Sequence, residues 1–261
     1  MLRPRIIPCL LVHNGGLVKT VGFKTPKYVG DPINAVKIFN EKEADELVVL
    51  DIDASVKGVE PNYGLIAKLA AECRMPLCYG GGITSAQQAA RIIDLGVEKV
   101  SVSAAAVARP GLLGEMAAAI GKQSVVAVID VRKKSGMFSR GHEVCTHNAT
   151  LGHAQDPIEL ALQLEAAGAG EIVLNSVDRD GSLKGYDLDI AQRLRASLKV
   201  PLTVLGGAGS LDHMGTLIQR CGVIGAAAGS LFVFKGQYRA VLINYPTPQQ
   251  KDALFAASLP R

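Results

Sequence analysis

Short aliphatic runs alternate with amphipathic stretches along the whole chain. At residues 32–44, 86–95 and 157–167 the apolar positions recur every three to four residues, which predicts helices. The β-branched and aliphatic runs between such stretches predict strands that are buried on both faces. We expect eight strands, at residues 6–12, 46–51, 76–79, 99–103, 124–130, 171–177, 201–205 and 223–228. Eight strand–helix units in one chain predict an α/β fold, a closed (βα)8 or TIM barrel.

An internal repeat divides the chain into two similar halves. The segment Asp-Ile-Asp-Ala-Ser-Val-Lys-Gly at residues 51–58 recurs as Asp-Arg-Asp-Gly-Ser-Leu-Lys-Gly at residues 178–185. The glycine run at residues 80–82 recurs, at almost the same offset, at residues 206–209. We therefore expect a single-domain barrel built from two related half-barrels. The expected limits are 1–122 and 123–245 for the halves, and 246–261 for a C-terminal tail that forms a short helix or frays.

Composition and charge argue against several classes of function. Hydrophobic residues make up 48% of the chain, yet no apolar run approaches the roughly 20 residues that span a bilayer. The net charge is +4, with Lys and Arg spread among acids, so neither nucleic acid nor a membrane surface is an expected partner. The five cysteines lack the spacing of a metal site or a disulfide framework. We expect reduced thiols, no metal, no cofactor and a cytoplasmic location.

Glycine-rich turns follow the third and seventh predicted strands, at residues 80–82 and 206–209. Small residues end the fourth and eighth strands, at 103–104 and 229–230, beside these turns. Unhindered backbone N–H groups ahead of a helix N-terminus bind anions. Because the turns are duplicated at matching positions, they predict a ligand that carries a phosphate at each end.

Acidic side chains follow several predicted strands at one end of the barrel. Asp130 ends the fifth strand, Asp51 ends the second and Asp180 follows the sixth. Acids at these strand ends suit general acid and base catalysis, although acids there also cap loops. The halves differ where Leu11 aligns with Asp130, and leucine cannot transfer a proton. Asp130 therefore lacks a symmetric partner, unless the neighbouring His13 supplies one.

Four charged side chains lie at the opposite ends of the predicted strands. Arg5, Glu46, Lys99 and Glu171 start the first, second, fourth and sixth strands. Two acids and two bases in a ring would seal the bottom of the barrel by ion pairing. The alternative is a gate, whose charges swing apart to admit a small neutral molecule such as ammonia.

Two long connections occupy equivalent places in the halves. Residues 13–30 follow the first strand and residues 131–155 follow the fifth, and both are rich in Gly, Lys, His and Asn. Because both follow the C-terminal ends of strands, they are candidate lids over a site. The alternative is that they are inert insertions.

Several motifs together resemble one known family. The cyclase subunit of imidazole glycerol phosphate synthase is similar at residues 5–10, 30–32, 45–51, 80–83, 170–171, 178–181, 185–187 and 206–209. The resemblance extends from the first strand to about Phe234. It implies a (βα)8 barrel whose N-terminal face docks on a glutaminase subunit as a heterodimer. Ammonia from the glutaminase would pass the gate of Arg5, Glu46, Lys99 and Glu171.

The resemblance also implies roles for individual residues at the C-terminal face. There, in the synthase, ammonia meets a doubly phosphorylated ribulosyl-aminoimidazole and two aspartates drive cleavage and cyclisation. Asp130 matches one of these aspartates, and Leu11 replaces the other. Ser103 and Ala104 replace an Asn-Thr pair that helps to hold one phosphate. The expected substrate and phosphate site comprises Lys19, Asp51, Gly82, Ser103, Asp180, Gly181, Gly207 and Ser230.

Losing one acid while keeping the ammonia-entry ring changes the expected reaction. Catalytic acids contribute about 10² to 10⁴ in rate, so Leu11 should cripple the cyclase. The combination resembles paralogues found with surface-polysaccharide and nonulosonate genes, which implies sugar amidation together with a glutaminase and an ATP-dependent amidotransferase. The alternatives are a genuine lyase-type cyclase of histidine biosynthesis and a non-catalytic ammonia conduit. A phosphosugar isomerase is less favoured, because it would need paired acids and no polar ring.

Overall fold

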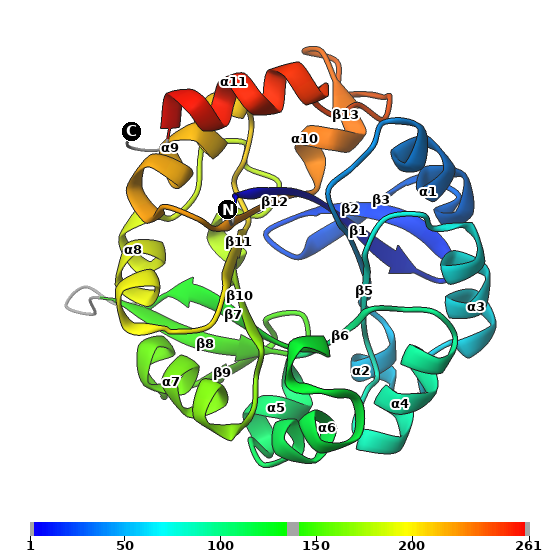
Figure 1. The fold of residues 1–261 in the computed structure, drawn as a ribbon, viewed down its shortest axis with the longest axis vertical. Coiled ribbons are helices and arrows are strands. Elements are labelled where there is room, and N and C mark those ends of the chain that lie inside the picture. Colours follow the sequence, from blue (N-terminus) through cyan, green and yellow to red (C-terminus); the bar gives the residue numbers. More distant parts are fainter. Residues whose placement is uncertain (1–2, 135–140, 259–261) are drawn as a thin grey trace.

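Eight parallel strands close into a barrel in the computed structural model, which describes residues 3–134 and 141–258 (Figure 1). Each strand pairs in parallel with the next, and the last returns to the first. The barrel strands are β1 (Arg5–His13), β4 (Leu47–Asp51), β5 (Leu77–Gly80), β6 (Lys99–Val102), β7 (Val125–Lys133), β10 (Glu171–Ser176), β11 (Leu202–Leu205) and β12 (Gly225–Ala228). The predicted (βα)8 barrel is confirmed.

Helices surround the barrel and bury an apolar layer against the outside of the strands. The longer ones are α1 (Pro32–Glu41), α3 (Tyr63–Glu72), α4 (Ala86–Asp94), α6 (Leu112–Ile120), α7 (Pro157–Ala167), α8 (Leu188–Ser197), α9 (Leu211–Cys221) and α11 (Pro248–Ser258). Short turns of helix are α2 (Ala54–Lys57), α5 (Ala104–Ala108), α10 (Ser230–Val233), η1 (Lys122–Ser124) and η2 (Val177–Arg179). A smaller cluster of Cys78, Val126, Val128 and Val173 fills the inside.

Side-chain caps explain where several helices begin. The carboxylate of Asp31 accepts a hydrogen bond from the Asn34 N–H, and Pro32 occupies the first turn, where its missing N–H costs nothing. Ser85 and Ser210 cap α4 and α9 in the same way, three residues after Gly82 and one residue after Gly209. The caps fix where these helices start, and so place the glycine turns at the barrel mouth.

Antiparallel hairpins form most of the described part of the two long connections. After β1 the chain forms β2 (Gly16–Val21) and β3 (Lys24–Gly30), and after β7 it forms β8 (His142–Thr146) and β9 (Leu151–His153). Residues 135–140 of the second connection lie outside the described residues. A third, shorter hairpin pairs β13 (Phe234–Lys235) with β14 (Ala240–Val241).

The predicted strand limits need small corrections. β7 continues past Asp130 to Lys133, because its last residues pair with β8. β12 starts at Gly225, since Val223 is 45% exposed and precedes the barrel wall. The C-terminal tail was expected to form a short helix or to fray, and α11 is a helix there. Residues 259–261 lie outside the described part.

Candidate active site at the barrel mouth

A cavity opens at the C-terminal ends of the strands, where the sequence predicts the site. Its wall includes most of the predicted site residues, namely Leu11, Lys19, Asp51, Ser103, Asp130, Asp180, Gly181, Gly207 and Ser230. Gly82 is not in the wall formed by the described residues; its N–H donates to the Ser55 hydroxyl (3.3 Å). The barrel therefore gathers residues from both halves of the chain around one cavity.

Asp130 is the acid of this cavity best placed to exchange a proton. Its Oδ1 accepts a hydrogen bond from the Asn175 amide (2.8 Å), and its Oδ2 accepts one from the Ser103 hydroxyl (3.3 Å). Burial raises the pKa of Asp130 to about 6, against the lowering effect of these two hydrogen bonds. Because this pKa is close to neutral, the carboxyl can hold or release a proton under ordinary conditions.

Lys19 brings a buried positive charge to the cavity. The side chain lies on β2 and is 5% exposed, and its ammonium donates to the carbonyl oxygen of Cys9 (2.6 Å). Burial lowers the pKa of Lys19, while Cys9 and Asp180 act in the opposite direction. No carboxylate of the described residues lies within 4.0 Å of its ammonium, so a bound anion would supply the missing countercharge.

Asp180 and Asp51 shape the rim of the cavity. Asp180 accepts hydrogen bonds from the Thr20 hydroxyl (2.7 Å) and the Phe23 N–H (3.2 Å), which tie the β2–β3 hairpin to the loop after β10. Asp51 accepts from the N–H groups of Asp53 (2.9 Å) and Ala54 (3.1 Å), and so holds its own loop. Both carboxylates have the loop-capping role that was the alternative to catalysis.

The glycine-rich turns bring bare backbone to the cavity. Gly206 and Gly207 have φ of +97° and +106°, and a Cβ on Gly207 would lie 2.1 Å from the carbonyl oxygen of Gly185. Side chains are therefore excluded from this turn, which directly precedes α9. On the other half, Gly81 is equally constrained, because a Cβ there would lie 2.5 Å from the Asp51 carbonyl oxygen. Both turns therefore bring backbone without a side chain, at Gly81 and Gly207, to the cavity wall.

His13 does not compensate for Leu11. Its Nδ1 lies 2.6 Å from Oδ1 of Asp53, and its Nε2 lies 3.0 Å from the Asn14 amide nitrogen. Lys57 also binds Asp53 (2.9 Å), so the histidine belongs to a surface network. Among the described residues that form the cavity wall, Leu11 is present and His13 is not.

Among the polar residues of the cavity that the sequence did not predict are Asn175, His147 and Asn148. A signal existed for Asn175, since it is a polar residue inside an aliphatic strand and pairs in register with Asp130. His147 and Asn148 lie at the tip of the β8–β9 hairpin. Their place in the cavity depends on how that hairpin folds back, which composition alone does not reveal.

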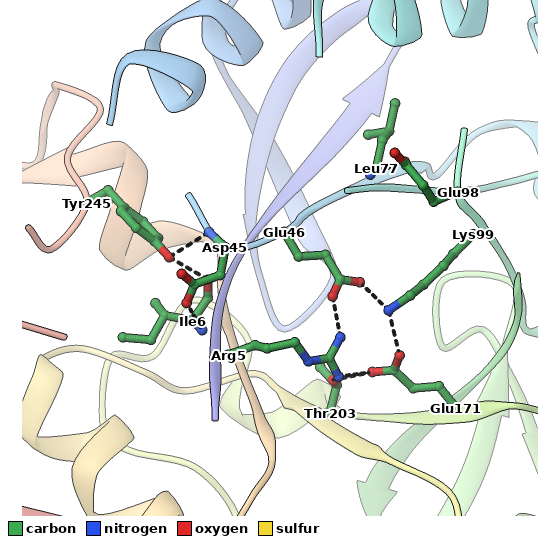
Figure 2. Close-up of polar contacts among 10 residues, drawn as sticks. All are labelled: Arg5, Ile6, Asp45, Glu46, Leu77, Glu98, Lys99, Glu171, Thr203 and Tyr245. Atoms are coloured by element: carbon green, nitrogen blue, oxygen red, sulfur yellow. Dashed lines mark hydrogen bonds and ion pairs between the residues drawn. The ribbon is translucent and has the colours of Figure 1, made fainter. Parts of the chain in front are cut away.

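At the opposite end, the four predicted charges form a closed ring (Figure 2). Arg5 bonds Glu46 and Glu171 (2.7 Å to the latter), and Lys99 bonds the same two carboxylates at 2.9 Å each. The Thr203 hydroxyl adds a bond to Glu171 (2.6 Å). Burial opposes ionisation of Glu171, but Arg5 and Lys99 outweigh it and hold its pKa below the usual range. The ring closes the bottom of the barrel.

A second, apolar cavity lies between this ring and the mouth. It touches Glu46 and Glu171 below, and shares five wall residues with the mouth cavity: Cys9, Leu50, Ser101, Val128 and Leu205. The buried Ser101 hydroxyl has no hydrogen-bond partner among the described residues. The barrel axis therefore holds a narrow apolar space with one unsatisfied polar group along its length.

The described residues lack both a membrane-spanning helix and a cluster of metal-binding side chains. Across residues 3–134 and 141–258, no helix is long and apolar enough to cross a bilayer. The same residues contain no group of three or more His, Cys, Asp or Glu side chains arranged to hold a metal ion.

Comparison with known proteins finds a family model and relatives that belong to the same family. The chain matches the family model described as "Histidine biosynthesis protein" over residues 5–239. It is 57% identical over 255 residues to a Leptospira borgpetersenii protein provisionally named imidazole glycerol phosphate synthase subunit HisF, covering 98% of this chain and 100% of the relative. A Vibrio vulnificus protein with the provisional name imidazole glycerol phosphate synthase subunit hisF3 is 57% identical over 251 residues, 96% of each chain. The imidazole glycerol phosphate synthase subunit HisF of Streptomyces coelicolor is 39% identical over 234 residues, 89% of this chain and 91% of that one.

Proposed function

This chain belongs to the histidine biosynthesis protein family, as a chain similar to the cyclase subunit of imidazole glycerol phosphate synthase, and from that premise we propose that it receives ammonia for another reaction. The ammonia comes from a glutaminase subunit docked at the N-terminal face of the barrel. The acceptor is a sugar of surface-polysaccharide biosynthesis, with an ATP-dependent amidotransferase as a further partner.

The presence of Leu11 in the cavity wall is the observation that carries this proposal. It provides no acid or base opposite Asp130, and His13 is held outside the cavity by Asp53. A cyclisation driven by two acids loses one of them, which costs about 10² to 10⁴ in rate. The cavity therefore fits the family's own reaction less well than a reaction that needs one acid.

Ammonia delivery is supported by what the chain keeps. The ring of Arg5, Glu46, Lys99 and Glu171 is complete, and an apolar cavity leads from it toward the mouth. A neutral molecule such as ammonia crosses an apolar space at far lower cost than an ion. The unsatisfied Ser101 hydroxyl offers it one hydrogen-bond partner on the way.

A bound sugar phosphate is supported by Lys19 and by the glycine turns. The buried ammonium lacks a carboxylate within 4.0 Å among the described residues, and Gly207 contributes backbone to the cavity wall ahead of α9. Charge-assisted bonds from an ammonium and from backbone N–H groups suit a phosphate.

The genuine cyclase remains the second candidate, because Asp130 and Lys19 both line the cavity. The provisional names of the relatives at 57% identity are those of imidazole glycerol phosphate synthase subunits, which fits this candidate. A third possibility is a conduit that binds ammonia without chemistry of its own.

Steady-state cyclase activity separates these candidates. The parent, Leu11→Asp and Asp130→Asn proteins are assayed with the ribulosyl-aminoimidazole bisphosphate substrate and ammonium salt. We expect no turnover by the parent and detectable turnover by Leu11→Asp. Parent turnover at ordinary enzyme rates that disappears in Asp130→Asn would make the chain a working cyclase and reject the proposal.

A further inference from the structure

The β8–β9 hairpin reaches across the cavity mouth to the side on which Leu11 lies. The Asn148 amide donates to the carbonyl oxygen of Ile52 (2.9 Å), directly after β4. The Ile52 N–H in turn donates to the carbonyl oxygen of Val12 on β1 (3.1 Å). The hairpin tip therefore sits at the rim between β4 and β1, and its residue His147 lines the cavity.

The tip is held in an unusual backbone conformation. His147, Asn148 and Ala149 have φ of 53°, 54° and 60°, a run of three left-handed residues without a glycine. Two hydrogen bonds hold these three residues in place. Arg132 donates to the carbonyl oxygen of Ala149 (3.0 Å), and the Thr150 hydroxyl donates to the carbonyl oxygen of His147 (2.6 Å). Such strain persists where surrounding contacts impose it, and it concentrates at functional sites.

A buried hydroxyl joins His147 to a second histidine. The Oγ1 of Thr146, a residue that is 2% exposed, lies 3.1 Å from Nδ1 of His147 and 2.9 Å from Nε2 of His153. A hydroxyl has one proton to donate, so it donates to one ring and accepts from the other. In that arrangement the two rings are coupled. When Nδ1 of His147 is protonated, Nε2 of His153 is unprotonated. When Nε2 of His153 is protonated, Nδ1 of His147 is unprotonated.

We propose that His147 is the second proton-transfer residue of the cavity, with Thr146 and His153 as positioning residues that complete a relay. The inference rests on the proposed function, in which the ammonia nitrogen bonds to a carbon that the ATP-dependent partner has activated, the activated oxygen leaves with its phosphate group, and the nitrogen must lose a proton. Nε2 of His147 takes that proton and Nδ1 releases its own to the Thr146 oxygen. The hydroxyl proton moves to Nε2 of His153, and Nδ1 of His153 loses a proton to water.

This assignment explains how the cavity manages without an acid at Leu11. Asp130 enters from β7, whereas the hairpin tip brings His147 to the β1 and β4 side. Imidazole is a suitable proton carrier because its ordinary pKa of about 6.5 is close to neutral. One passage leaves both imidazoles protonated on the other nitrogen without moving a side chain, and exchange with water restores the starting tautomers.

Histidine titration by ¹⁵N NMR tests the relay without any substrate. We expect His147→Gln to shift the midpoint of the His153 titration curve by about half a pH unit or more when Thr146 is present. In the Thr146→Val background the same substitution should shift it at least threefold less. Equal shifts in the two backgrounds, or no shift in either, would overturn the relay. Circular dichroism of Thr146→Val checks that the hairpin and barrel remain folded.

Turnover tests the proton-transfer role, in whichever ammonium-dependent reaction the parent, which keeps Leu11, shows. We expect His147→Gln to lower kcat about 100-fold with KM nearly unchanged, and imidazole to restore part of the loss in His147→Gly. His13→Gln is the matched control, since His13 lies at the same rim outside the cavity, and it should change kcat less than twofold. An unchanged kcat in His147→Gln overturns the role. If the parent does not turn over, the titration alone decides the relay, and failure of the proposed function is seen separately.

Discussion

The side-chain amide of Asn175 donates to Oδ1 of Asp130 at 2.8 Å, and the two residues also pair in register between β10 and β7. The amide stabilises the charged carboxylate, whereas burial favours the protonated form, and burial is the larger effect. Together they leave the pKa of Asp130 at about 6, a value at which it can accept or give a proton near neutrality.

Asp130→Asn should increase the free energy of unfolding at neutral pH. Because its pKa of about 6 in the folded state exceeds the value of about 3.9 for an unfolded Asp, the folded state binds this proton more tightly. Stability therefore falls as the pH rises between these two values, and the loss persists above them. Part of the carboxylate faces the cavity, so we expect a gain of about 1–2 kcal/mol at pH 7.5.

Urea unfolding of the parent and of Asp130→Asn from pH 4 to pH 8 measures this gain. It should be small near pH 4, grow through pH 6 and level off. A gain that is independent of pH would mean that ionisation of Asp130 is not its cause.

Lys99→Met should lower the free energy of unfolding at pH 7. Glu46 and Glu171 would be left with Arg5 as the one remaining cation of the ring, and removing one partner of a buried ion pair is costly. Lys99 is partly exposed, so we expect a loss of about 2–4 kcal/mol in urea unfolding.

The double variant Lys99→Met with Glu171→Gln is the control for the ring. It removes one charge of each sign, and we expect it to recover most of the lost stability. In the parent, burial disfavours the charge of Glu171, but Arg5 and Lys99 hold its pKa low. This contribution is present above the unfolded pKa of about 4.3 and is lost as the pH falls through the folded pKa. A double variant less stable than Lys99→Met would contradict this account.

The barrel was predictable from the sequence because most of its strands are short, largely buried apolar runs. The hairpins were not, since β3 is almost entirely exposed and has no apolar periodicity. Its strand conformation comes from pairing with β2, which hydrophobic pattern does not encode.

The site was predictable only in part, for a related reason. Strand ends converge in any closed barrel, so Asp130 and Asp51 could be placed at one mouth before the structure was known. Whether an acid faces the cavity or caps a loop depends on contacts with other segments, such as those of Thr20 and Phe23 with Asp180. His147 was missed because its position follows from the Asn148 bond to Ile52, far away in sequence.

Lys19→Met should make the protein more stable and less able to bind phosphate. Burial disfavours the charged ammonium and lowers the pKa of Lys19, so an apolar side chain of similar length removes that cost. Each 1 kcal/mol added to the free energy of unfolding corresponds to a rise of about 2–4 °C in Tm for a chain of this size. Inorganic phosphate should raise the Tm of the parent and not that of Lys19→Met.

Thermal unfolding at several phosphate concentrations checks both the higher stability and the weaker phosphate binding of Lys19→Met. Lys37→Met is the control, because Lys37 lies on the exposed face of α1. It should leave the phosphate-dependent shift unchanged. An equal shift in the parent and in Lys19→Met would show that the cavity lysine does not bind the anion.

Lys251→Met should weaken the attachment of α11 to the bottom of the barrel. Lys251 is 4% exposed, and its ammonium donates to Oδ1 of Asp45 (2.6 Å), whose Oδ2 accepts from the Ile6 N–H (2.9 Å; Figure 2 shows Asp45 and Ile6). Methionine keeps the aliphatic stem but leaves the carboxylate without its cation, so we expect a loss of about 3 kcal/mol in urea unfolding. Adding Asp45→Asn should restore part of it. A loss below about 0.5 kcal/mol, typical of surface substitutions, would mean that the pair does not anchor the helix.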